Sequence, residues 1–166
     1  MIVRKATTRD ANSLDELDRS AWEEIKNWSL QTKQNFKRSL KNQKFYFLIA
    51  SEDKKDVGYL ESEYDKENSG NYVTNSPEFS NGQFLRTSNI TNRIVHKEKD
   101  DVWLKNIYVL KKFRKKNIAR YLIKKCCDYW KKKIDLILLL TADRNLEIFE
   151  RLGFNKTMNY MVRIIK

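Results

Sequence analysis

The chain has 166 residues, of which 40% are hydrophobic and 34% charged, and its formal net charge is +12. This length and composition suit one folded domain and argue against an intrinsically disordered chain. The longest apolar run, Leu136 to Leu140, is too short to cross a membrane, and the N-terminus lacks the apolar stretch of a secretion signal, so we expect a single domain over residues 1–166 in a cytoplasmic protein without membrane contact.

The first part of the chain predicts a strand, two helices and a β-hairpin. Apolar residues recur at helical spacing after a cap near Asp10, and again where Phe36 and Leu40 lie one turn apart. Two runs rich in aromatic and β-branched residues then flank a polar turn. The expected elements are a strand at 2–6, a helix ending near residue 25, a helix at 32–42, and strands at 44–50 and 57–64.

Residues 65–101 predict a long variable loop. They hold two of the four glycines and the only proline, Pro77, among many Asn and Ser residues. Short strands or a helical turn are conceivable at 84–85 and 90–95. A loop of this length within a compact domain is usually functional or mobile.

The second half predicts alternating strands and helices. The expected strands cover 102–110, 134–141 and 156–165, and the expected helices cover 117–130 and 143–152. The near-continuous apolar run at 134–141 is typical of a strand covered on both faces. The element order is therefore β-α-α-β-β-(loop)-β-α-β-α-β, which indicates a mixed α/β fold.

The segment Phe113 to Arg120 follows a strand and opens a helix. A helix N-terminus carries unpaired backbone amides and a partial positive charge, so basic side chains around it favour a site for a phosphorylated cofactor. At Arg114, Asn117 and Ala119 the segment resembles the Arg/Gln-x-x-Gly-x-Gly/Ala loop of the GNAT superfamily of acyl-coenzyme A N-acyltransferases. Asn117 stands where glycine is expected, and asparagine is the least costly substitute where φ must be positive.

This resemblance implies a GNAT-like mixed central sheet of about six to seven strands, flanked by about four helices, with acetyl-coenzyme A as co-substrate and no metal. It also implies that the strand before the loop pairs through its backbone with the pantetheine arm. The cofactor-binding residues expected from it are Ile107, Tyr108, Val109, Arg114, Lys115, Lys116, Asn117, Ile118, Ala119 and Arg120. One histidine and two adjacent cysteines offer no standard zinc site.

The resemblance further implies that a neutral amine attacks the thioester directly. The usual proton donor of the family, a tyrosine in the last helix, is replaced by Phe149, which we expect to be a core residue. Water, Tyr108 or Tyr121 would then protonate the leaving thiolate.

The base is open. Glu61 and Glu63 share a strand face because they are two residues apart, and they are the first candidates. The others are Asp100 and Asp101, whereas His96 is expected to be a solvated bystander.

Charge distribution suggests the partners. Residues 52–101 hold 7 basic and 11 acidic side chains, and residues 102–166 hold 17 basic and 5 acidic. A mildly acidic segment near the acceptor suits an amine on a small molecule or a protein, with the enzyme acting as a monomer or homodimer.

Two alternatives remain. One is a degenerate family member that binds coenzyme A as a sensor or scaffold without turnover. The other is a basic RNA- or DNA-binding module, which the absence of RNP, KH and helix-turn-helix signatures disfavours.

Overall fold

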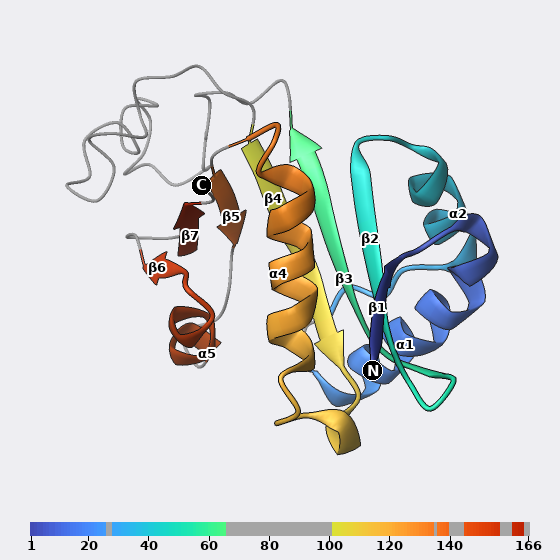
Figure 1. Cartoon of the computed structure of the whole chain (residues 1–166). Coiled ribbons are helices and arrows are strands. Elements are labelled where there is room, and N and C mark those ends of the chain that lie inside the picture. The colour runs from blue at the N-terminus through green and yellow to red at the C-terminus, as the bar shows by residue number, and fades with distance from the viewer. Residues whose placement is uncertain (26–27, 66–100, 135, 140–144, 157–160, 165–166) are drawn as a thin grey trace, which may run out of the picture. The chain divides into compact units, whose positions relative to one another are not determined.

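The structure is a computed structural model that describes residues 1–25, 28–65, 101–134, 136–139, 145–156 and 161–164 (Figure 1). Residue contacts divide the chain into two compact units. The first contains Met1–Glu63 and Leu104–Tyr129, and the second contains Tyr64–Trp103 and Trp130–Lys166. The single domain expected over residues 1–166 concerns both units together and stays a prediction.

The first unit is built from a four-stranded layer and three α-helices of the described residues. Two short 3₁₀ turns, η1 and η3, precede α1 and follow β4. The elements are β1 (Ile2–Lys5), η1 (Thr8–Asp10), α1 (Ala11–Glu24), α2 (Lys33–Lys41), β2 (Phe45–Glu52), β3 (Lys55–Asp65), β4 (Asp101–Val109), η3 (Lys111–Phe113) and α4 (Ile118–Trp130).

The strands of this unit run in the order β1-β2-β3-β4. β1 and β2 are antiparallel, and so are β2 and β3, where Leu48 lies opposite Leu60. Asp53 and Lys54 close the β2–β3 hairpin with φ of 51° and 64°. The amide of Leu110 donates to Val57 O at 2.9 Å, so the end of β4 lies beside the start of β3.

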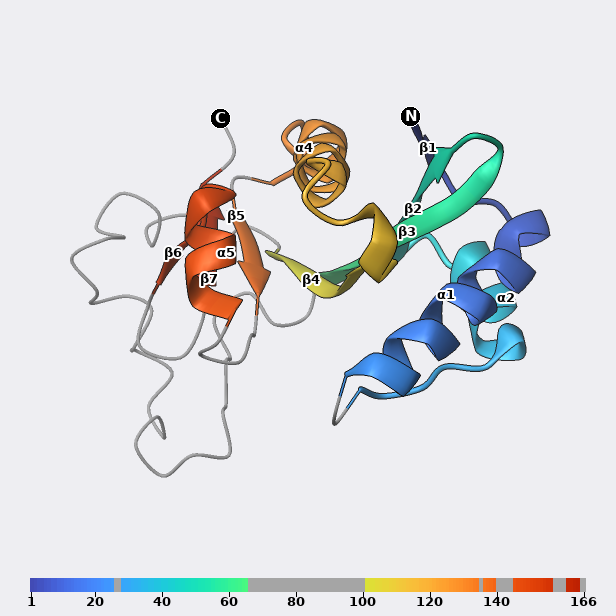
Figure 2. The same cartoon turned by 90° about the horizontal axis from the view of Figure 1, so that it is seen from below.

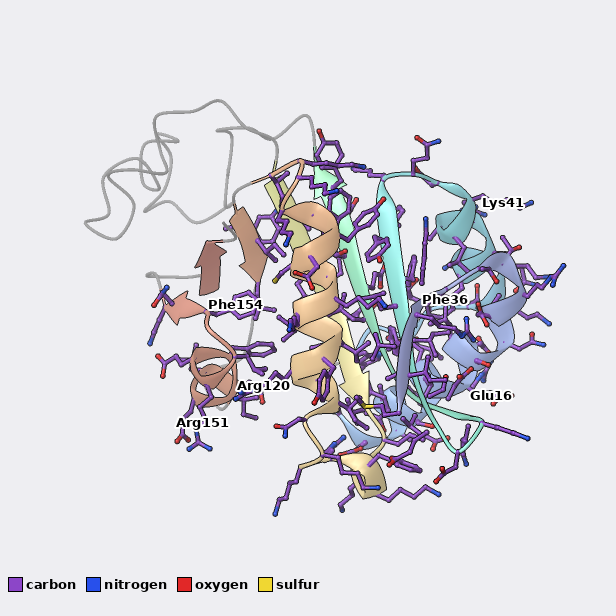
Figure 3. All side chains as sticks on the ribbon, in the orientation of Figure 1. Glu16, Phe36, Lys41, Arg120, Arg151 and Phe154 are labelled. Carbon is purple, nitrogen blue, oxygen red and sulfur yellow. The ribbon has the colours of Figure 1, made fainter. Side chains whose placement is uncertain are left out.

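Helices cover both faces of these strands. α1 and α2 lie on one face and α4 lies on the other (Figure 2). Phe36 of α2 is fully buried and points toward the sheet, whereas Glu16 and Lys41 lie on the outer surface (Figure 3). Aromatic contacts confirm the two faces, because Phe47 packs on Phe36 while its neighbour Tyr46 stacks on Tyr129 of α4.

The second unit contains β5 (Leu136–Leu139), α5 (Leu146–Arg151), β6 (Asn155–Lys156) and β7 (Met161–Ile164). β7 pairs antiparallel with both β5 and β6. On α5, Phe149 is buried and packs edge-on against Phe154 at 5.8 Å between ring centroids. The core role expected for Phe149 is confirmed.

The mixed α/β architecture expected from the sequence is confirmed, with corrections to the element bounds. The helix expected from residue 117 begins at Ile118, because Asn117 has the left-handed φ of 61° that no α-helix accommodates. The single closing strand expected at 156–165 is wrong, because β6 and β7 are separate strands that pair with each other antiparallel. The short elements suggested at 84–85 and 90–95 lie outside the described residues. No helix in the described ranges has the length and apolar character needed to span a bilayer.

Candidate active site

The turn between β4 and α4 has an unusual backbone. After η3, Lys115 and Asn117 both adopt left-handed φ, at 63° and 61°. The sequence predicted this conformation for Asn117, where a glycine is expected by resemblance. The left-handed Lys115 was not predicted, since lysine has no preference for this region.

Four consecutive amides at the start of α4 have no intramolecular hydrogen-bond partner among the described residues. They are the backbone N–H groups of Asn117 to Arg120, and the first amide of α4 to be bonded is that of Tyr121, which donates to Asn117 O at 3.1 Å. Left-handed residues turn successive N–H groups toward one side, and the helix dipole adds partial positive charge. Such a turn can bind an anion such as a diphosphate.

Basic side chains surround these amides. Lys111, Lys112, Lys115 and Arg120 are exposed. Lys116 pairs with Glu52 at 3.2 Å, and the ammonium groups of Lys112 and Lys116 lie 5.1 and 5.3 Å from the centre of the Phe113 ring. The positive charge expected for a phosphate site is therefore gathered on one short segment.

Arg114, an exposed residue, braces the turn through its side-chain hydrogen bonds. Its Nε donates to Val109 O at 2.9 Å, and its two terminal nitrogens donate to the Glu24 carboxylate at 2.5 and 2.7 Å. The guanidinium holds the pKa of Glu24 below its usual range. Arg114 thus ties the turn to β4 and to the last residue of α1, while its expected role toward the cofactor stays a prediction.

Tyr108 joins the same network from β4. Its hydroxyl donates to Glu24 Oε2 at 3.0 Å, and its ring meets Trp28 edge-on at 6.1 Å. Burial, with a smaller contribution from Glu24, raises the pKa of Tyr108 to about 12. A phenol of that pKa is a weaker acid than a thiol, which makes Tyr108 a poor donor of a proton to a thiolate.

Glu61 is a buried carboxylate on β3. It is 4% exposed, and its Oε2 accepts hydrogen bonds from Gln31 Nε2 and Asn106 Nδ2, both at 2.7 Å. Burial raises the pKa of Glu61, and the two amide donors partly oppose that rise because they stabilise the ionised form. A carboxylate with a raised pKa can accept a proton under near-neutral conditions.

Glu63, the second candidate base, lies in a different electrostatic setting. Its carboxylate pairs with Lys44 at 3.1 Å and with Lys105 at 3.3 Å. The Glu63 carboxylate is therefore engaged by two lysines, whereas the hydrogen-bond donors to Glu61 are two neutral amides. Of the two expected carboxylates, Glu61 therefore has the environment better suited to proton abstraction.

Residues 42–156 match the acetyltransferase (GNAT) domain family. The chain belongs to this family. The matched residues include β2, β3, the turn that precedes α4, and helix α5.

Several solved structures share the GNAT fold with this chain. A GNAT-family acetyltransferase from Staphylococcus aureus is 16% identical, with a TM-score of 0.69 over 99% of each chain. Arabidopsis thaliana NAA60 in complex with acetyl-CoA is 14% identical, with a TM-score of 0.67 over 99% of this chain and 98% of that one. An aminoglycoside acetyltransferase, meta-AAC0020, from an uncultured soil metagenomic sample in complex with sisomicin is 16% identical, with a TM-score of 0.62 over 90% and 83%. A search of curated protein sequences found no match.

Sequence reasoning missed three polar residues around Glu61 in this GNAT domain. Asn106 lies two residues before Tyr108 on β4, so strand alternation could have placed both on one face. Asp18 falls in the apolar stripe of α1, between Leu14 and Ala21, and a charge at such a position is a detectable signal. Gln31 follows no pattern that would reveal its contact.

Proposed function

We propose that this chain is an N-acetyltransferase that moves an acetyl group from acetyl-CoA to a primary amine by direct attack. The observation that carries the proposal is the run of amides from Asn117 to Arg120, at the N-terminus of α4, that find no partner in the described part of this GNAT-family chain. These amides would hold the cofactor diphosphate, and the neighbouring basic side chains would neutralise its charge.

The strand before the turn would position the thioester. In the proposal, the backbone of Ile107 and Val109 pairs with the pantetheine arm, and a backbone N–H near Ile107 polarises the acyl carbonyl. Holding the amine and the thioester together supplies much of the rate.

Glu61 is the base that the geometry favours. The amine nitrogen bonds to the acyl carbon, Glu61 takes a proton from that nitrogen, and the carbon–sulfur bond breaks to release coenzyme A as a thiolate. Water protonates the thiolate, with Tyr108 as the second candidate. Glu63 is the alternative base.

The acceptor is an amine on a small molecule or on a protein. The acidic balance of residues 52–101 and the presence of aminoglycoside acetyltransferases among the structural neighbours support an amine-bearing acceptor. We place the reaction in the cytoplasm, in a single domain over residues 1–166 that works as a monomer or homodimer.

Binding of acetyl-CoA tests the proposal through Ala119→Glu. Ala119 lies in the first turn of α4, so a carboxylate there would repel the cofactor phosphates. We expect acetyl-CoA at 100 times its dissociation constant to stabilise the parent protein by about 2.7 kcal/mol in a thermal-shift measurement, and the variant by almost nothing.

Gln34→Glu is the matched control, since it adds the same charge on the exposed surface of α2. It should keep the parent response. An Ala119→Glu protein that binds acetyl-CoA like the parent would contradict the site.

A coenzyme A-binding sensor is the second candidate, favoured by the buried Phe149 at the position of the usual tyrosine. It predicts binding of acetyl-CoA without acetylation of any amine in a broad panel. A nucleic-acid module predicts salt-sensitive RNA binding and no response to acetyl-CoA.

A further inference from the structure

A network of hydrogen bonds connects two buried carboxylates, Asp18 of α1 and Glu61 of β3. Asp18 is fully buried, and its Oδ1 accepts from the Tyr59 hydroxyl at 2.6 Å and from Trp28 Nε1 at 2.8 Å. Its Oδ2 accepts from the backbone amide of Gln31 at 2.7 Å. Three donors therefore compensate a charge that would otherwise be costly to bury.

Gln31 links Asp18 to Glu61, the proposed base. Its backbone is held by Asp18, and its side-chain amide donates to Glu61 Oε2 at 2.7 Å. One residue thus bonds both carboxylates, one through its main chain and one through its side chain.

We propose that Asp18 and Gln31 are positioning residues for Glu61: Asp18 fixes the segment from Trp28 to Gln31, and Gln31 fixes the Glu61 carboxylate. This inference rests on the proposed function, in which Glu61 is the base. It assigns a role to two side chains that would not touch the acceptor or the cofactor.

The local backbone explains why Asp18 is needed. Residues 28–32 form neither helix nor strand, so no ladder of main-chain bonds holds them. Asp18 bonds both Trp28 and Gln31, Trp28 also meets Tyr108 edge-on and donates its amide to Ile25 O at 3.1 Å, and Thr32 caps α2. Without Asp18, the main chain of Gln31 would lose the hydrogen bond that fixes its position, and its side chain would no longer be held toward Glu61.

Other charged and titratable groups also face Glu61. Asp18 from α1 disfavours its ionised form, and Lys105 from β4 favours it, while Tyr59 lies on the same strand. The amides of Gln31 and Asn106 favour the ionised form through hydrogen bonds. Removing the Gln31 amide therefore pushes the titration of Glu61 toward higher pH.

Gln31→Ala is the decisive variant, because it deletes the side-chain amide and keeps the backbone bond to Asp18. Titration of ¹³C-labelled glutamate carboxyl groups by NMR, with Glu61 assigned through Glu61→Gln, should show the Glu61 midpoint at higher pH than in the parent. With an amine found active in the panel, kcat/KM at pH 7 should fall about tenfold, the rate equivalent of one hydrogen bond to a charged group. The acidic limb of the pH profile should move in the same direction as the NMR midpoint.

Gln34→Ala is the control, since it is the same truncation at an exposed site on α2. It should match the parent in both measurements.

Asp18→Asn tests the other half of the inference. An asparagine has one acceptor oxygen, so it cannot satisfy the donors on both sides of the native carboxylate. We expect faster hydrogen exchange at the Gln31 amide and lower kcat/KM for the amine, with an unchanged KM for acetyl-CoA. If this variant does not fold, Gln31→Ala still decides.

The outcomes separate the two proposals. A shifted Glu61 titration in Gln31→Ala without any acetyl transfer keeps the positioning role and removes the proposed function. Acetyl transfer that depends on Glu61, with parent-like titration and pH profile in Gln31→Ala, overturns the positioning role.

Discussion

Glu61, the proposed base, illustrates at the residue scale how a catalytic role would come at the expense of stability. Its pKa is raised by burial, so the unfolded chain ionises Glu61 at lower pH than the folded protein does. Stability from this group therefore declines as pH rises above the unfolded pKa of 4.5, and the loss is complete above the raised folded pKa. A buried carboxylate with a raised pKa destabilises the folded protein at neutral pH, so its presence is not explained by a contribution to stability.

Glu61→Gln should separate the effect of Glu61 on stability from its proposed role in acetyl transfer. Glutamine keeps an acceptor oxygen for Gln31 and Asn106 and removes the ionisation. We expect the urea midpoint at pH 7 to equal or exceed that of the parent, with a smaller difference at pH 4, while acetyl transfer falls about 10²-fold or more.

Glu63→Gln is the comparison, since it loses two partly exposed ion pairs worth about 1 kcal/mol or less. If Glu63→Gln abolishes transfer and Glu61→Gln does not, the assignment of the base is reversed.

At the scale of elements, Asp10 joins β1 to the start of α1. Its carboxylate accepts two hydrogen bonds from the Arg4 guanidinium, at 2.9 and 2.7 Å. It also accepts hydrogen bonds from the amide and the hydroxyl of Thr7. The Arg4 guanidinium is the largest cause that lowers the pKa of Asp10 to about 2. An acid with a lowered folded pKa stabilises the protein above its unfolded pKa near 4, and that stabilisation disappears as pH falls toward 2.

Asp10→Asn is expected to cost about 1 kcal/mol at pH 7, after allowance for solvent screening of the half-exposed Arg4. The cost should vanish near pH 2, which urea unfolding at several pH values would reveal. Asp53→Asn, in the exposed hairpin turn, is the reference because it removes a carboxylate at a site away from Arg4. A pH-independent cost would rule out the ion pair as its source.

The contact between β3 and β4 depends on Gly58. A Cβ at this position would lie 2.7 Å from Tyr108 O and 3.1 Å from Val109 Cγ2. The first neighbour is backbone, so β4 itself would have to move. Gly58→Ala should lower the free energy of unfolding by about 1–3 kcal/mol and weaken acetyl-CoA binding, because the displaced residues lead into the turn. Isothermal titration and urea unfolding with parent-like values would show that the strands tolerate the methyl group.

At the scale of the whole molecule, local patterns predicted far more than long-range contacts did. The strand, turn and helix over residues 102–130 were predicted because apolar periodicity and the resemblance of the turn are features of adjacent residues. The left-handed φ of Asn117 was predicted from the same local comparison.

The environment of Glu61 could not be predicted in this way. Its partners Gln31 and Asn106 are 30 and 45 residues away in the chain, and only the packed fold brings them together. Strand alternation placed Glu61 and Glu63 on one face as equals, and their different partners distinguish them. Arg114 likewise matched a loop pattern, whereas its partner Glu24 lies 90 residues away.

The backbone is left-handed at both Lys115 and Asn117. Both residues carry a Cβ, so this geometry costs about 1 kcal/mol at the lysine and less at the asparagine. If the turn holds the cofactor as proposed, a diphosphate that meets this backbone would have no rearrangement to drive. The affinity of the proposed site would then come from charge and contact, and steering by the lysines would give a binding rate that falls as salt is added.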